Sequence, residues 1–332
     1  MKVLRTLLVL LILGAAAAAG AAWWWLQQPL PLAASSVELS IEPGTSPRDI
    51  ARGWVAAGVQ VPPWSLYQWF RWSGQSRKIR AGSYEITTGA TPRELLRKMV
   101  QGDESQATVM LIEGWTFRQF RAELARADAL KPTTANMSDA EIMAALGLPG
   151  VSPEGRFFPD TYAYSKGSSD LAVLKRALRA MQRRLADAWE QRSPASPLHN
   201  PDEALTLASI VEKETGREAD RSMVGGVFAN RLRIGMPLQT DPTVIYGLGE
   251  RFDGNLHKRD LLADGPYNTY TRAGLPPTPI AMPGKAALLA AVKPADTRAL
   301  YFVSRGDGSS EFSDTLDAHN RAVNKYQRGQ GQ

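Results

Sequence analysis

Residues 202–216 read DEALTLASIVEKETG, a helical pattern that ends in a glycine. At roughly 100° per residue, Leu207, Ile210 and Val211 share one apolar face, and Glu214 falls in the middle of it. Desolvation on such a face disfavours a carboxylate and raises its pKa, and the negative end of the helix dipole acts in the same direction. The pattern therefore predicts Glu214 as a general acid. The alternative is that its side chain reaches solvent over the end of the helix.

The chain after this helix changes character. A second helix over about 218–234 has an apolar stripe, and residues 235–284 then form a long stretch rich in Pro, Gly, Asn, Thr and Tyr. So long a stretch without regular structure is usually either functional or misread, and because of its many hydrogen-bonding side chains we interpret it as functional. Two short strands around Gly306-Asp307-Gly308 predict a hairpin, followed by a closing helix with His319 and Asn320.

The segment before the helix contains regular helix-start signals. Ser46-Pro47-Arg48-Asp49 and Thr91-Pro92-Arg93-Glu94 each place a capping hydroxyl first and a proline at the first helical position. Each follows an extended piece, so residues 37–103 indicate a small α+β module, which is either a carbohydrate-binding module or a structural subdomain. Residues 104–200 predict a strand, two helices with capping boxes at Thr116 and Ser138, and a basic helix over about 169–191 whose arginines form a solvated face.

An almost unbroken apolar run occupies residues 6–26 and ends in Trp23-Trp24-Trp25. About 20 such residues span a bilayer core, and the two cations within residues 1–5 favour a cytoplasmic start. A cleaved signal peptide is the alternative, because the alanines of the run offer a processing site. We favour a retained transmembrane helix, since the tryptophans lie beyond the alanines. Residues 27–36 are then a linker, and the rest of the chain lies outside the cytoplasm.

Composition excludes several classes of function. The 332 residues are 44% hydrophobic and 22% charged, an ordinary globular balance that is long enough for two domains. The net charge of +6 comes from scattered basic runs without interleaved aromatic residues, so we expect no nucleic acid as a partner. The lack of cysteine excludes disulfides and thiolate metal sites.

The remaining titratable residues offer weaker candidates. Glu113, Glu154 and Asp160 occupy strand ends or turns, where capping is the simpler role, whereas Asp241 lies in the polar stretch with a site role and a turn role both open. The three histidines lack the spacing of a metal pair, and the sequence contains no HExxH, GxGxxG or GxSxG motif. Carboxylate acid/base chemistry is what remains.

Two long blocks carry a family resemblance. Residues 207–215 (LASIVEKET) and 227–247 (VFANRLRIGMPLQTDPTVIYG) closely resemble the endolytic murein transglycosylases of the MltG/YceG-like family, and shorter blocks follow at 267–280 and from 301 to 320. The resemblance implies an α+β protein with a single transmembrane helix, a small LysM-like α+β module over 37–103 and a mixed α/β catalytic domain over 104–332, with its core at 202–328. It places the protein in the bacterial cytoplasmic membrane, with the N-terminus inside.

The resemblance also implies an activity and site residues. The activity is cleavage of the β-1,4 bond between N-acetylmuramic acid and N-acetylglucosamine in nascent glycan strands, with peptidoglycan synthases (penicillin-binding proteins) as partners and no cofactor or metal. The family's catalytic glutamate corresponds to Glu214, the residue that the helical pattern already predicts. Carried over as substrate-binding residues of the cleft are Asn230, Gln239, Thr240, Asp241, Tyr246, Asn268 and Tyr270.

The chemical hypothesis uses one carboxyl group twice. Glu214 protonates the glycosidic oxygen and its carboxylate then takes the proton of the muramic 6-hydroxyl, which closes a 1,6-anhydro ring, whereas a hydrolase needs a second carboxylate. Arg231 or Gln239 is suited to stabilise developing charge. The alternatives are a hydrolytic muramidase that pairs Glu214 with Asp241 or Glu154, and a non-catalytic scaffold that binds peptidoglycan.

Overall fold

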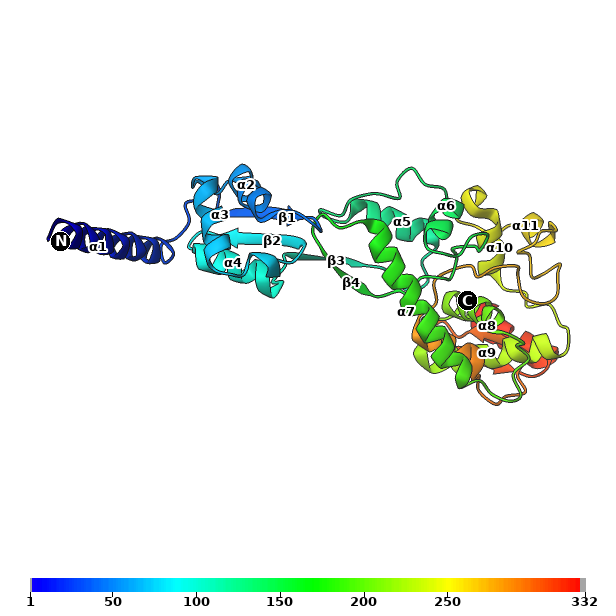
Figure 1. Cartoon of the computed structure of the whole chain (residues 1–332). Helices are drawn as coiled ribbons and strands as arrows, with labels where there is room; N and C mark the ends of the chain where they lie inside the picture. Colours follow the sequence, from blue (N-terminus) through cyan, green and yellow to red (C-terminus); the bar gives the residue numbers. More distant parts are fainter. Residues whose placement is uncertain (1, 329–332) are drawn as a thin grey trace. The chain divides into compact units, whose positions relative to one another are not determined.

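The computed structural model describes residues 2–328 and has a mixed α+β fold (Figure 1). The chain divides into two compact units, each with its own core. Unit 1 contains residues 1–107 together with the short pieces 128–130 and 163–168, and unit 2 contains the remainder.

Unit 1 begins with the apolar helix α1 (Lys2–Trp25). Within it, residues Arg5–Trp25 are long and apolar enough to span a membrane, and 21 residues at 1.5 Å each give about 31 Å. Leu26, the last residue of the predicted span, directly follows α1 and is only 9% exposed. Within the predicted linker, Leu30 is buried and its N–H donates to the carbonyl of Ala90 at 2.8 Å.

The rest of unit 1 is a two-stranded antiparallel sheet covered by helices. Strands β1 (Ser36–Ile41) and β2 (Gly82–Thr87) pair with Ser36 opposite Thr87. Helices α2 (Pro47–Ala57), α3 (Pro63–Trp72) and α4 (Pro92–Gln101), with the 3-10 turn η1 (Ser76–Lys78), complete it. Trp54, Leu66, Phe70, Tyr84, Leu95 and Met99 are fully buried in its core. The predicted strands are confirmed, whereas α3 lacked a polar cap and was missed.

The predicted helix starts are confirmed by their hydrogen bonds. Ser46, Thr91, Thr116 and Ser138 each accept from the backbone N–H three residues ahead, and the last three form complete capping boxes. These bonds satisfy donors that a helix leaves free at its first turn, which is why the local sequence alone predicts them.

Unit 2 is mainly helical. Its strands β5 (Tyr301–Ser304) and β6 (Ser310–Ser313) form the predicted hairpin. A further two-stranded sheet consists of β3 (Gln106–Met110) and β4 (Thr161–Ser165), whose residues are divided between the two units. The helices of unit 2 are α5 (Phe117–Arg126), α6 (Asp139–Ala145), α7 (Asp170–Glu190), α8 (Pro201–Glu214), α9 (Glu218–Arg233), α10 (Asp241–Leu248), α11 (Lys258–Leu262), α12 (Lys285–Val292) and α13 (Leu316–Val323), with η2 (Gly249–Arg251) and the π turn η3 (Asn324–Arg328). Residues 235–284 thus contain two helices that the sequence did not predict.

Helix α8 is the centre of unit 2. Helices α7, α9, α10 and α12 all pack against it, and every residue from Ala204 to Val211 is buried. More of the helix is buried than the predicted apolar face, because Thr206 on another face is buried as well. Its hydroxyl donates to the carbonyl of Asp202 at 2.9 Å. Gly216 follows the helix as predicted, but its φ is not in the left-handed region.

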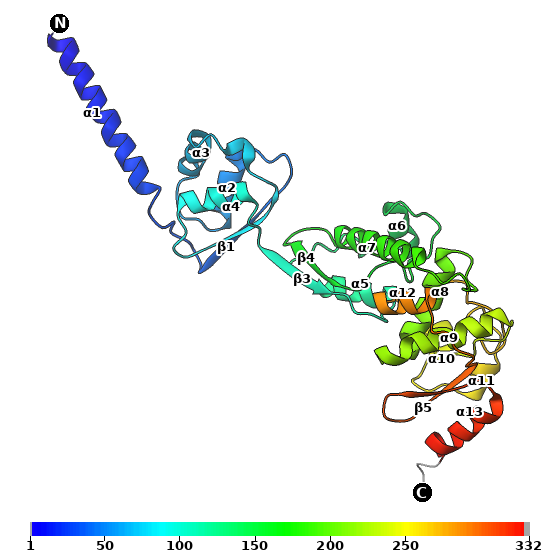
Figure 2. The ribbon, with the colours of Figure 1, turned by 90° about the horizontal axis from the view of Figure 1, so that it is seen from below.

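Close crossing of helices explains a glycine pair in α9. A Cβ at Gly225 would lie 2.4 Å from the carbonyl oxygen of Ala290 in α12, and one at Gly226 would lie 2.7 Å from the Thr297 side chain. Only glycine permits this approach. Helix α9 thereby holds α12 and the segment that leads into β5, and α13 packs on the resulting hairpin (Figure 2).

Candidate active site

A cavity of about 430 Å³ lies within unit 2 at the end of α8, a volume in the range of small-ligand pockets. Residues from α8, α9, the start of α10 and the segment before it, the loop before α12, β5 and α13 converge on it. They are Glu214, Arg231, Leu238, Gln239, Asp241, Tyr270, Tyr301, Phe302, Leu316, His319 and Asn320.

Glu214 is the last residue of α8 and is half-buried in this wall. The end of the helix is fixed by Glu212, whose carboxylate accepts from the N–H of Gly284 at 2.9 Å and lies 3.6 Å from the guanidinium of Arg221. Because Glu212 ties α8 to the start of α12, the direction in which Glu214 leaves the helix is set by the core.

The pKa of Glu214 is raised above its ordinary value. Burial of the carboxyl group is the main cause, and the negative charge of Asp241 adds to it. The hydroxyl of Thr240, which donates to Glu214 Oε1, and the nearby charge of Arg231 act in the opposite direction. A raised pKa keeps the proton on a carboxyl group to a higher pH, which suits a general acid.

The segment that faces Glu214 is held in a strained conformation. Gln239 has a φ of 49°, a left-handed value that few non-glycine residues adopt. Its N–H donates to the carbonyl of Thr269 at 3.0 Å, and the N–H of Thr240 donates to the Thr269 hydroxyl at 3.1 Å. Thr243 donates to the carbonyl of Thr240 at 2.8 Å. These buried bonds stabilise the strained turn, which directs the Thr240 hydroxyl to the carboxyl group.

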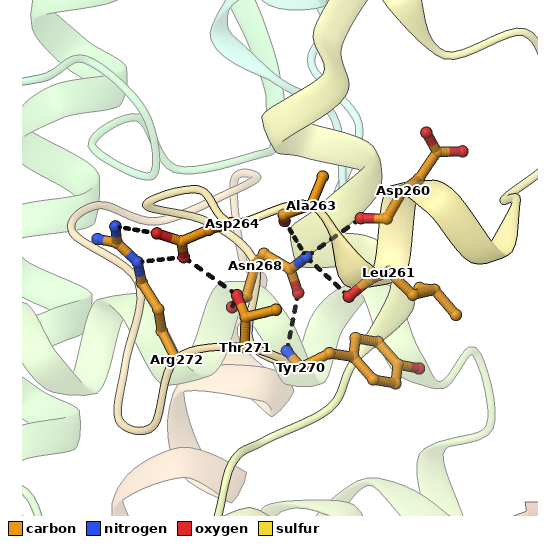
Figure 3. Close-up of polar contacts among 8 residues, drawn as sticks. All are labelled: Asp260, Leu261, Ala263, Asp264, Asn268, Tyr270, Thr271 and Arg272. Atoms are coloured by element: carbon orange, nitrogen blue, oxygen red, sulfur yellow. Dashed lines mark hydrogen bonds and ion pairs between the residues drawn. The ribbon is translucent and has the colours of Figure 1, made fainter.

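Tyr270 reaches the cavity from a loop that Asn268 organises (Figure 3). The Asn268 amide donates to the carbonyls of Asp260, Leu261 and Ala263 at 3.1, 3.1 and 2.7 Å. Its oxygen accepts from the N–H of Tyr270 at 2.9 Å. The Tyr270 hydroxyl then donates to Asp241 Oδ1 at 2.6 Å, so one buried amide fixes the position of a residue in the wall.

Arg231 supplies the buried positive charge of the site. It is 7% exposed, and its guanidinium donates to the carbonyls of Leu300 and Leu238, both at 2.7 Å. The group also lies over the ring of Tyr301, 5.3 Å from the centroid. Neutral carbonyls do not cancel its charge, so it remains available to stabilise a negative charge in the cavity.

His319 and Tyr301 close the far side of the cavity. Their rings stack at 5.2 Å, and within the described part of the chain His319 Nδ1 is buried without a hydrogen-bond partner. Burial and the charge of Arg231 lower the pKa of His319, which favours the neutral imidazole. The sequence did not predict these two residues as part of the site, although both lie in the C-terminal block of the family resemblance.

The predicted residues fall into two groups. Glu214, Gln239, Asp241 and Tyr270 line the cavity, and Thr240 donates to Glu214. The others make structural contacts away from the wall, as Asn268 does.

Asn230 donates to the carbonyls of Thr297 and Ala299 at 2.8 and 3.0 Å. The Tyr246 hydroxyl donates to buried Glu154 at 3.2 Å, where burial raises the pKa of Glu154 to about 7. Neither Asn230 nor Tyr246 lines the cavity.

Metal binding finds no support in the described residues, 2–328. No group of three or more His, Asp or Glu side chains among them has an arrangement that could hold a metal ion.

Comparison with known proteins gives a consistent picture. Residues 39–325 match the sequence profile of the YceG-like family. An endolytic murein transglycosylase of Bacillus subtilis (strain 168) is 30% identical over 309 residues, which cover 88% of this chain and 85% of that protein. One of Streptococcus pneumoniae (serotype 2, strain D39 / NCTC 7466) is 27% identical, over 90% of this chain and 60% of that longer protein.

A solved structure is also similar. The crystal structure of a yceG-like protein from Listeria monocytogenes aligns with a TM-score of 0.56 and 28% identity, over 86% of this chain and 98% of that one.

Proposed function

The chain belongs to the YceG-like family, and from this premise we propose that it is an endolytic murein transglycosylase, a lyase that cleaves the glycan strands of peptidoglycan. The bond cleaved is the β-1,4 bond between N-acetylmuramic acid and N-acetylglucosamine. The observation that carries the proposal is the position of Glu214, a half-buried carboxyl group with a raised pKa in a cavity lined by polar side chains.

The first step is protonation of the leaving group. Glu214 gives its proton to the glycosidic oxygen as the bond from that oxygen to C1 of the muramic residue breaks. The carboxylate that results is stabilised by the Thr240 hydroxyl and by the positive charge of Arg231. Both groups favour the anion, so they assist the transfer of the proton, whereas burial and the charge of Asp241 oppose it.

The second step closes a ring. The 6-hydroxyl oxygen of the muramic residue bonds to C1, and its proton passes to the carboxylate of Glu214. The net change moves one proton from O6 to the leaving oxygen, so water is not consumed and Glu214 returns to its starting state. One carboxyl group is sufficient, whereas a hydrolase requires two.

The presence of Asp241 in the same cavity favours a second candidate function, a hydrolytic muramidase. The carboxylate of Asp241 lines the cavity and could activate a water molecule. Against this role, Asp241 Oδ1 already accepts the Tyr270 hydroxyl at 2.6 Å. We therefore propose that Asp241 tunes the pKa of Glu214 and does not act as a base.

The proposal includes the location of the enzyme. Residues 6–26 anchor it in the bacterial cytoplasmic membrane with the N-terminus inside, in support of which α1 is long and apolar enough to span. Residues 37–103 form a LysM-like module and 104–332 the catalytic domain. Peptidoglycan synthases (penicillin-binding proteins) are the expected partners, because nascent strands emerge beside them and cleavage would end their elongation.

The test compares two glutamine variants on undigested glycan strands. Glu214→Gln should abolish cleavage and leave binding to the wall intact, whereas Glu218→Gln, an exposed residue at the start of α9, should cleave normally. Mass spectrometry of the products distinguishes the candidates, because an anhydro end is lighter than a reducing end by one water. Reducing ends would indicate the muramidase, and wild-type cleavage by Glu214→Gln would refute the site. A wild-type chain that binds the wall without cutting would be a scaffold.

A further inference from the structure

Helix α3 exposes two large tryptophans. Its inner face buries Leu66 and Phe70 in the core of unit 1, so Trp64 and Trp72 lie on the outer face, eight residues apart. They are 67% and 72% exposed. Single exposed apolar residues are common on protein surfaces, whereas a continuous exposed patch of them marks an interaction site.

The patch is continuous with the apolar N-terminal helix. A groove of about 470 Å³ has Trp64, Trp69 and Trp72 on one side and Ala18 and Ala22 of α1 on the other. Among the described residues, none of those lining the groove is charged. The two helices thus share one apolar surface within unit 1.

The depth of this surface is set by the span itself. Ala18 lies seven residues before Trp25, the end of the candidate span, which is about 10 Å along the helix axis. Interfacial elements bury their apolar face by roughly 5–10 Å, and tryptophan is enriched at that level. Trp23 and Trp24 of α1 are also about 60% exposed at the same end.

We propose that the outer face of α3 lies in the interfacial layer of the bilayer that α1 spans. The module is then held on the membrane surface by two elements, and its orientation is restricted. Arg71, Arg77 and Lys78 are exposed on α3 and the turn after it, where they can contact anionic headgroups. The inference rests on the proposed anchoring by α1.

A lipid surface fits this patch better than a sugar does. Exposed tryptophans also stack on glycans, but one wall of the groove is built from Ala18 and Ala22, which belong to the candidate span. A polar glycan strand at that place would have to enter the apolar part of the bilayer, whereas the acyl chains and headgroups of lipids are already there.

The experiment uses the full-length chain, which has no cysteine of its own. Trp64→Cys and Trp72→Cys are each labelled with an environment-sensitive fluorophore in vesicles of phosphatidylethanolamine and phosphatidylglycerol. Leu11→Cys in α1 reports the anchor, and Arg48→Cys, exposed at the start of α2, reports the aqueous surface of the module. Quenching by aqueous iodide and by brominated lipid is measured for each.

The expected result is a several-fold loss of iodide quenching and a gain of lipid quenching at positions 64 and 72 relative to 48. If 64 and 72 are quenched by iodide as 48 is while 11 is shielded, the anchor stands and the inference is wrong. If 11 is also exposed to iodide, both fail. Shielding of 64 and 72 that appears only after glycan strands are added would make α3 a sugar platform and refute the lipid contact.

Discussion

Replacing Thr240 by valine removes the hydroxyl that donates to Glu214 Oε1 and leaves a side chain of nearly the same size. Thr240 is 2% exposed, and its backbone bond to Thr269 is independent of the side chain, so the fold of the segment should persist. The hydroxyl is one of the two groups that favour the carboxylate of Glu214, beside Arg231. Its loss should raise the pKa of Glu214 further.

The size of the effect follows from the hydrogen bond. A bond to a charged acceptor contributes about 1.5–3 kcal/mol, and a pH unit corresponds to about 1.4 kcal/mol. Because a general acid works only while it holds its proton, activity falls where Glu214 ionises. The alkaline limb of the pH–rate profile should therefore move upward by roughly one to two pH units in Thr240→Val.

The assay is the initial rate of release of anhydro products from glycan strands, measured across pH. Thr240→Ser keeps the donor and should restore the wild-type profile. Thr206→Val is the matched control, because it removes a buried hydroxyl of α8 that donates to the carbonyl of Asp202 and not to Glu214. An alkaline limb that stays in place, or moves to lower pH, in Thr240→Val would refute the tuning of Glu214 by this bond.

Three further predictions concern the surroundings of Glu214. Asp241→Asn removes a charge that raises its pKa, so the alkaline limb should move to lower pH; an unchanged profile would contradict this. Gln239→Gly should raise the free energy of unfolding by up to about 1 kcal/mol in urea titrations and lower activity, whereas Ala129→Gly, at a φ of 50°, should raise stability without loss of activity. Destabilisation by Gln239→Gly would show that the turn is unstrained. Asn268→Ala should lower the free energy of unfolding by about 1–3 kcal/mol and raise KM, because three backbone carbonyls and the N–H of Tyr270 lose their partner. A wild-type KM would exclude the positioning role.

Local signals in the sequence predicted local structure well. Hydroxyl, proline and acid spacings gave the helix starts, since a cap is satisfied within four residues. The helical period likewise placed Glu214 beside the apolar residues of α8, whereas its role as the catalytic acid stays a prediction. The pKa of Glu214 is raised in the predicted direction, and burial, the first predicted cause, is the largest one; the charge of Asp241 is a cause that the sequence did not predict.

Contacts between distant segments were beyond such signals. His319 lies more than 100 residues from Glu214 in the chain yet lines the same cavity, and only the packing of α13 on the hairpin brings it there. Conversely, Asn230 and Asn268 lie in the blocks that resemble the family, but their side-chain NH2 groups donate to backbone carbonyls and not into the cavity. A motif therefore does not distinguish a residue that lines the cavity from one that holds the backbone behind it.

The burial of α8 on every side has a consequence for how a glycan is accommodated. Segments enclosed in this way exchange their amide hydrogens only when the whole domain opens, whereas exposed loops fluctuate at small cost in free energy. The carboxyl group is thus mounted on an enclosed helix, whereas α13, which brings Leu316, His319 and Asn320 to the cavity, buries only Ala322 among its residues. We therefore expect sugar entry and product release to displace α13, while Glu214 keeps its position.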